Sequence, residues 1–138
     1  MKFLKTIVFA LCLVLVFGSC AQMAEAPESE EEVKQSYVNI TAEEAKEIMD
    51  NESGYVILDV RTEEEFAAGH IPGAILIPDY EIAEKAESVL TDKNQTILVY
   101  CRSGRRSKLA AEKLLELGYT DIKEFGGIID WKYETVKP

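Results

Sequence analysis

Short apolar runs alternate with amphipathic segments along most of the chain, and turn or cap signals separate them. Short strands are expected at 37–40, 55–58, 74–77, 96–100 and 122–125, and the continuous apolar run at 55–58 is typical of a strand covered on both faces. Periodic segments predict helices over 41–50, 62–68, 81–90 and 105–117, and the first two open with capping boxes. This alternation predicts an α/β fold: a small, mainly parallel five-stranded sheet with helices on both faces.

The N-terminal segment does not follow this alternation. Lys2 and Lys5 precede an uninterrupted apolar run over 7–17. The run is too short to span a bilayer, which takes about 20 residues, but it fits the hydrophobic region of an export signal.

The residues that end this run indicate a cellular location. Gly18-Ser19-Cys20 resembles the lipobox of bacterial lipoproteins. That resemblance implies a lipidated Cys20 as the mature N-terminus, on the periplasmic or extracellular face of a bacterial membrane. The alternative is an ordinary secretory signal cut near Ser19 or Ala21.

Composition divides the 138 residues into three predicted parts. These are a signal at 1–19, an acidic flexible tether at 20–36, and one folded domain at 37–138. Net charge is −10, and it becomes −12 when the signal with its two lysines is removed. So acidic a chain is a poor candidate for binding nucleic acid or for electrostatic adhesion to anionic lipid, and membrane contact is therefore expected through the lipid only.

Cysteine use adds a constraint. The chain has three cysteines. Cys12 lies in the signal and Cys20 is the expected lipidation site, which leaves Cys101 as the one mature thiol. A single thiol cannot form an intramolecular disulfide, so Cys101 is either an inert core residue or a functional group.

The surroundings of Cys101 favour function. Cys101 follows the strand at 96–100 and precedes a tight loop and a helix. Backbone N–H groups and a helix N-terminus at such a place stabilise a thiolate, so we expect a lowered pKa. Gly104 allows a positive φ. The chain's one dense basic cluster also lies here and can hold an anionic substrate; its members are Arg102, Arg105 and Arg106.

Three sequence blocks in order resemble the signatures of single-domain rhodanese-like sulfurtransferases, the thiosulfate sulfurtransferase family. They are 60–66 (VRTEEEF), 69–74 (GHIPGA) and 101–107 (CRSGRRS). Gly126-Gly127, where the C-terminal tail is expected to begin, followed by Trp131 is similar to that family's closing motif. The resemblance covers about 37–132.

This resemblance implies covalent sulfur transfer. The Cys101 thiolate attacks the outer sulfur of a donor such as thiosulfate, sulfite leaves, and the Cys101 persulfide passes its sulfur to cyanide or a thiol. It requires no metal or organic cofactor, and a monomer is expected. The substrate-binding loop is then Arg102, Ser103, Gly104, Arg105, Arg106 and Ser107.

The resemblance gives other residues structural roles. Asp59 and Arg61 are expected to brace the active loop as an ion pair or hydrogen-bonded couple. His70, the only histidine, lies in a turn and is not expected to act as a general base. Trp131 is expected to pack in the core.

Three other functions remain open. Cysteine phosphatases also use a thiolate in an anion loop, but they place an arginine at the sixth position after the cysteine, where this chain has Ser107. A non-catalytic binding module usually lacks the cysteine. A persulfide carrier needs the same thiolate as an enzyme, so the sequence does not separate the two.

Overall fold

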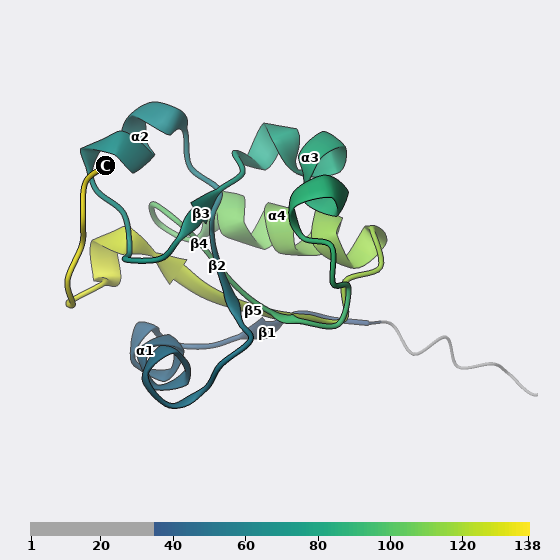
Figure 1. The fold of residues 1–138 in the computed structure, drawn as a ribbon, viewed down its shortest axis with the longest axis horizontal. Coiled ribbons are helices and arrows are strands. Elements are labelled where there is room, and N and C mark those ends of the chain that lie inside the picture. Colours follow the sequence, from purple (N-terminus) through teal and green to yellow (C-terminus); the bar gives the residue numbers. More distant parts are fainter. Residues whose placement is uncertain (1–34) are drawn as a thin grey trace, which may run out of the picture. The chain divides into compact units, whose positions relative to one another are not determined.

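The computed structural model describes residues 35–138 (Figure 1). The predicted signal, the lipidation of Cys20 and nearly all of the predicted tether lie outside these residues. Among the described residues, no helix has the length and apolar character needed to cross a membrane.

One five-stranded sheet, parallel throughout, forms the centre of the domain. Its spatial order is β1-β5-β4-β2-β3, so β4 is the middle strand. The predicted fold class is confirmed. The strands are β1 (Val38–Asn39), β2 (Val56–Asp59), β3 (Ile75–Leu76), β4 (Thr96–Cys101) and β5 (Asp121–Gly127).

Within residues 35–138, four α-helices and two short 3-10 helices accompany the sheet. Both predicted capping boxes are present, at Thr41 with Glu44 and at Thr62 with Glu65. The elements are α1 (Ala42–Asn51), α2 (Glu63–Ala68), η1 (Asp79–Glu81), α3 (Ile82–Val89), α4 (Arg105–Glu116) and η2 (Ile128–Asp130).

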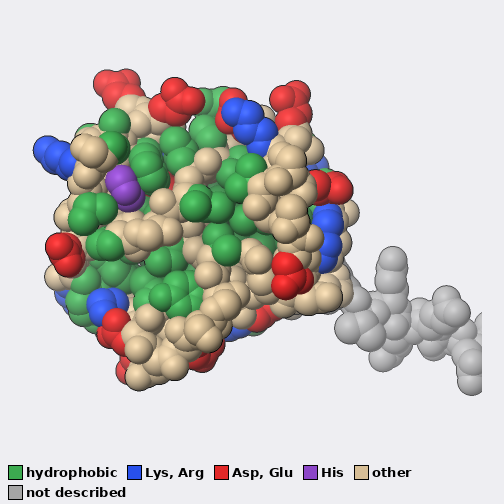
Figure 2. Space-filling model, in the orientation of Figure 1, with side chains coloured by type: hydrophobic (Ala, Val, Ile, Leu, Met, Phe, Trp, Pro, Cys, Tyr) green, Lys and Arg blue, Asp and Glu red, His purple; other side chains and the backbone are tan. Residues whose placement is uncertain are grey.

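The two faces of the sheet carry separate hydrophobic cores. Helices α3 and α4 pack on one face and α1 on the other (Figure 1). Side chains of β4 alternate between the faces, so Val99 and Cys101 belong to the α3–α4 core, whereas Leu98 and Tyr100 belong to the α1 core. Charged side chains lie mostly around the outline of the domain in Figure 2.

The C-terminal part differs from the sequence prediction. The prediction that Gly126-Gly127 begins the tail is wrong, because both residues belong to β5. The residues after η2 fold back, and Val136 exchanges two backbone hydrogen bonds with His70. No local pattern predicts this bridge, since it joins residues far apart in the sequence.

Candidate active site

Cys101 is the last residue of β4, at the carboxyl edge of the sheet and next to the N-terminus of α4. Its residue surface is only 1% exposed. The Gly104 N–H donates to the sulfur at 3.0 Å, and Gly104 reaches this position with φ +100°. The loop therefore closes around the sulfur as expected, and glycine is the residue that this conformation favours.

The environment favours the thiolate form of Cys101. Burial alone would raise the pKa of this thiol, because it disfavours a charged sulfur. The hydroxyl of Ser107 and the backbone N–H groups of Ser107, Gly104 and Ser103 outweigh burial and lower the pKa. This lowered pKa agrees with the expectation from the sequence.

Close packing against β5 shapes the loop. A Cβ on Gly127 would lie 2.0 Å from the carbonyl oxygen of Arg102, so only glycine fits there. The same oxygen accepts a hydrogen bond from the Ile129 N–H at 3.2 Å. Gly127 thus lets the Arg102 carbonyl lie directly against the end of β5.

The three arginines of the loop have different surroundings. Arg102 and Arg105 are exposed, and no ion pair holds either of them within residues 35–138. Arg106 instead donates from both terminal nitrogens to the two carboxylate oxygens of Glu65, at 2.8 Å each. The prediction that Arg106 binds substrate stays a prediction, and in this structure both terminal nitrogens of its guanidinium are paired with Glu65.

The Glu65–Arg106 pair links α2 to α4. The hydrogen bonds from Arg106 lower the pKa of Glu65 to about 2, against partial burial and with further donation from Thr62. Glu65 also completes the capping box of α2, so one carboxylate caps a helix and binds the loop arginine. The pairing was not anticipated, because these residues are 41 positions apart.

Ser107 and Glu124 form a buried couple behind the loop. The Ser107 hydroxyl donates to Glu124 Oε1 at 2.5 Å, and the Gly126 N–H donates to the same oxygen at 2.8 Å. Sequence reasoning missed Glu124. The signal available was an acidic residue between Ile122 and Phe125 in the short strand expected at 122–125.

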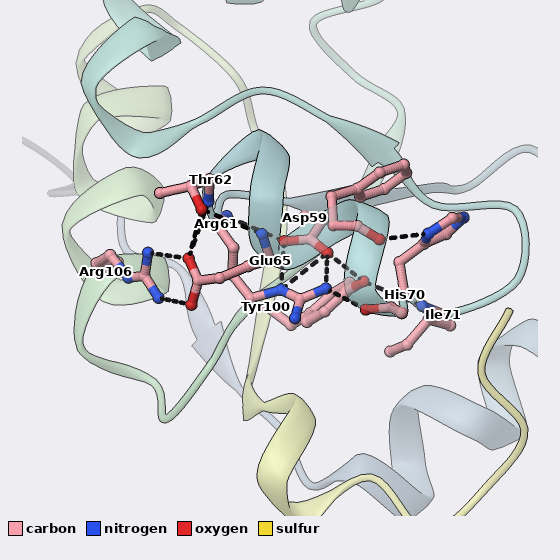
Figure 3. A network of polar contacts seen from close by, with 10 residues as sticks. Asp59, Arg61, Thr62, Glu65, His70, Ile71, Tyr100 and Arg106 are labelled. Carbon is pink, nitrogen blue, oxygen red and sulfur yellow. Dashed lines mark hydrogen bonds and ion pairs between the residues drawn. The ribbon is translucent and has the colours of Figure 1, made fainter. Parts of the chain in front are cut away.

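Asp59 and Arg61 form a buried ion pair, with Arg61 Nη2 2.6 Å from Asp59 Oδ2 (Figure 3). The same nitrogen donates to the Gly69 carbonyl at 2.7 Å. The Tyr100 hydroxyl donates to Asp59 at 2.6 Å and accepts from the Ile71 N–H at 3.1 Å. This network ties β2 and β4 to the turn at residues 69–71.

Two other singled-out residues have structural surroundings. The His70 ring stacks on Phe66 with centroids 3.7 Å apart, and its Nδ1 lies 3.0 Å from the Phe66 carbonyl oxygen. Trp131 packs against Phe125 and Tyr133, and its indole N–H donates to the Glu134 carbonyl. These contacts are those of residues that pack and fix local structure.

Known proteins share this architecture. The family model described as "Rhodanese-like domain" matches residues 41–134, more than half of the chain. "Thiosulfate sulfurtransferase PspE" of Escherichia coli (strain K12) is 42% identical over 80 residues, covering 58% of this chain and 77% of PspE. The solved structure "rhodanese with anions from E. coli" has a TM-score of 0.58 and 40% identity, covering 61% of this chain and 99% of that one.

Other relatives are much longer. "Adenylyltransferase and sulfurtransferase UBA4" of Candida albicans is 35% identical over 91 residues, which are 61% of this chain. The chain spans only 21% of that protein.

Proposed function

Since the chain belongs to the rhodanese-like domain family, we propose that it transfers a sulfane sulfur from a small anionic donor to a thiophilic acceptor through a persulfide on Cys101. Relatives named as sulfurtransferases support sulfur transfer in general. The observation that carries the specific proposal is the Cys101 sulfur, held at a helix N-terminus with a backbone N–H at 3.0 Å.

In the first half-reaction, the Cys101 thiolate attacks the outer sulfur of thiosulfate. The new bond joins Sγ to that sulfur, the sulfur–sulfur bond of the donor breaks, and sulfite leaves with the electron pair. The Cys101 persulfide anion remains. Exposed Arg102 and Arg105 are suited to attract the dianionic donor.

In the second half-reaction, a thiolate or cyanide attacks the outer sulfur of the persulfide. The bond between the two sulfurs breaks, and its electron pair returns to Cys101 as thiolate. Products are the acceptor persulfide or thiocyanate, and no net oxidation occurs. Backbone N–H groups of the loop stabilise both sulfur anions, because the dipoles are fixed before the reaction.

A cysteine phosphatase is a weaker proposal for this site. The sixth position after the cysteine is Ser107, which is fully buried and donates to Glu124. That position therefore lacks the arginine that cysteine phosphatases place there.

Steady-state kinetics test the proposal. With thiosulfate and cyanide varied together, a double-displacement enzyme gives parallel double-reciprocal lines. A persulfide carrier instead loads sulfur but turns over slowly until a specific protein thiol is supplied. Intersecting lines, or turnover that does not require Cys101, would contradict the persulfide mechanism.

We propose further that Cys20 is lipidated and anchors the domain to a bacterial membrane, on the periplasmic or extracellular face. Support comes from the sequence: a short apolar run after two lysines, ending in Gly18-Ser19-Cys20. One acyl chain binds a membrane marginally, whereas two or three on a single cysteine anchor it stably.

A further inference from the structure

Two large apolar side chains are exposed in one hollow of the surface near the active loop. Tyr80 and Leu109 are 68% and 53% exposed, and both line the same hollow of about 360 Å³. Single exposed apolar residues are common, whereas two that share a hollow form an apolar patch in contact with water. We call this hollow the α3–α4 groove. Its main lining residues are Asp79, Tyr80, Ala83, Leu109, Glu112 and Glu116.

The α3–α4 groove lies close to the active loop. Its lining residues come from η1, α3 and α4, and the two helices pack on the same face of the sheet (Figure 1). Helix α4 begins at the loop, and Leu109 is one turn further, about 6 Å along the helix axis. Arg106 has a raised pKa, chiefly because of its pairing with Glu65. The negative charges of Cys101 and Asp79 add to this rise, so both lie near Arg106.

The groove is open to solvent and does not enclose a ligand. Tyr80, Ala83, Leu109 and Glu112 are exposed, and among the described residues that line the groove only Ala110 is buried. A site for a small molecule normally covers most of the surface of its ligand. An open apolar patch with a polar rim is instead typical of a contact with another protein.

Charge narrows the kind of partner. The acidic lining residues are Asp79, Glu112 and Glu116, and Lys113, the one basic lining residue in the described part of the chain, is paired with Glu116. Like charges repel, so this surface does not suit the anionic sulfur donor, which the arginines of the loop attract. A basic surface complements it, and complementary charges favour fast and specific association.

We infer that the sulfur acceptor is a protein whose thiol lies beside basic and apolar side chains, and that this protein docks in the α3–α4 groove. The inference rests on the proposed function, because it names the acceptor class of the second half-reaction. The thiolate of the partner attacks the outer sulfur of the Cys101 persulfide, the bond between the two sulfurs breaks, and its electron pair returns to Cys101. Docking holds the attacking thiol next to the persulfide, and such proximity accelerates a reaction between two molecules.

The first test follows loss of sulfur from Cys101 in the full chain, after loading with thiosulfate and removal of the donor. The acceptor is a short synthetic peptide with one cysteine among lysines and leucines. Tyr80→Gln and Leu109→Gln should each lower its second-order rate roughly fivefold or more. Val89→Gln, at an exposed apolar position outside the groove, should leave this rate unchanged. Each rate is divided by the cyanide rate of the same chain, which corrects for any change at Cys101.

Two results would overturn the docking claim. One is a corrected peptide rate that is equal in Y80Q, L109Q and the wild type. The other is self-association of the wild type that both variants abolish, because the occupant of the groove would then be a second copy of this chain.

A charge reversal tests the chemistry of the partner. Glu112→Lys should slow the lysine–leucine peptide and speed a peptide with glutamates in place of the lysines, each by roughly fivefold at low salt. Glu47→Lys is the matched control, since Glu47 is exposed on α1, which packs on the other face of the sheet. Equal effects of the two reversals would mean that the peptides respond to net charge and not to the groove, which contradicts the inference.

Binding without sulfur transfer separates this inference from the proposed function. The lysine–leucine peptide, with serine in place of its cysteine, is titrated into the unmodified full chain labelled with nitrogen-15. Backbone resonances of residues 79–83 and 109–116 should shift more than those of α1. Shifts confined to other residues, or no shifts, would contradict docking in the groove. A Cys101 that never takes up sulfur would defeat the proposed function and leave this binding result intact.

Discussion

At the residue scale, we expect the exposed arginines of the loop to differ in role from Arg106, which is paired with Glu65. Replacing Arg102 or Arg105 with Ala should raise the KM for thiosulfate about fivefold at low salt, since each removes a charge worth roughly 1 kcal/mol near the donor. The effect should shrink at high salt, because screening weakens attraction between exposed charges. Initial rates across a salt series measure it.

Arg106→Ala is the informative comparison, because this guanidinium is held by Glu65. Its loss should lower the thermal midpoint more than the loss of Arg102 or Arg105. A KM effect confined to Arg106, with the other two variants unchanged, would show that the donor is not attracted by the exposed arginines.

The Glu65–Arg106 pair predicts a pH-dependent stability. The pKa of Glu65 in the folded chain is about 2, below its usual value of 4.5. A lowered carboxyl pKa contributes stability that is present above the unfolded pKa and is lost as pH falls through the folded pKa. Glu65→Gln should therefore lower the free energy of unfolding by about 1 kcal/mol or less at pH 6, and by almost nothing near pH 2.

Urea titrations at both pH values measure this difference. Glu64→Gln is the matched control, because Glu64 lies in the same helical turn, is exposed, and makes no ion pair within the described part of the chain. If E65Q and E64Q behave alike at pH 6, the pair contributes nothing to stability.

Local sequence predicted the loop around Cys101 but not the Glu65–Arg106 and Ser107–Glu124 contacts that support this loop. A cysteine after an apolar strand, a glycine and a helix start are neighbours in sequence, so their geometry follows from local rules. Glu65 reaches Arg106 across 41 positions, and Ser107 reaches Glu124 across 17. Such pairs become visible only when the tertiary structure brings distant strands and helices together.

At the element scale, the alternation of strands and helices was sufficient to predict the sheet. Parallel strands that are buried on both faces read as continuous apolar runs, and β2 and β4 show this most clearly. The end of β5 was missed because Gly126 and Gly127 are typical of turns. Both residues belong to β5 here. Glycine is needed at 127 because the Arg102 carbonyl oxygen lies too close to leave room for a side chain.

This contact predicts a strong effect for Gly127→Ala. The added Cβ would lie 2.0 Å from backbone, which cannot move aside like a flexible side chain, so the variant should lose about 3 kcal/mol or more of stability. The backbone φ at Gly127 is −139°, so the cost is steric and not conformational. Cys101 should also become more accessible to alkylation.

Gly54→Ala separates a clash from backbone strain. Gly54 has φ +78°, and an added Cβ there would meet nothing within 4 Å. The Gly54→Ala substitution should lower the free energy of unfolding by about 1 kcal/mol and leave the rate of Cys101 alkylation unchanged. Equal destabilisation of G54A and G127A in chemical denaturation would contradict this account of the loop.

At the scale of the whole molecule, an acidic domain carries one basic loop at its sheet edge. Charged side chains of both signs lie around the outline of the face in Figure 2. Arg102, Arg105 and Arg106 are close neighbours of Cys101 in the sequence. The net charge of −10 opposes anion binding over most of the surface. The three arginines next to Cys101 supply positive charge that favours it locally. The sequence alone predicts this contrast, since the three arginines are close neighbours in an otherwise acidic chain.

The proposed anchor predicts how the chain fractionates in a bacterium. Wild type should be found with membranes and carry lipid on Cys20, whereas Cys20→Ala should be released or misprocessed and keep Cys101 reactivity. Fractionation and the mass of the mature N-terminus measure this. A wild-type chain that is fully soluble and free of lipid would instead support an ordinary secretory signal.

The most direct test of the central claim is the mass of the Cys101 peptide after the protein is treated with thiosulfate. Wild type should gain one sulfur atom on that peptide and lose it again when cyanide is added. Cys101→Ser should gain none while keeping the wild-type circular dichroism spectrum. Sulfur uptake at another residue, or turnover that survives in C101S, would contradict the account.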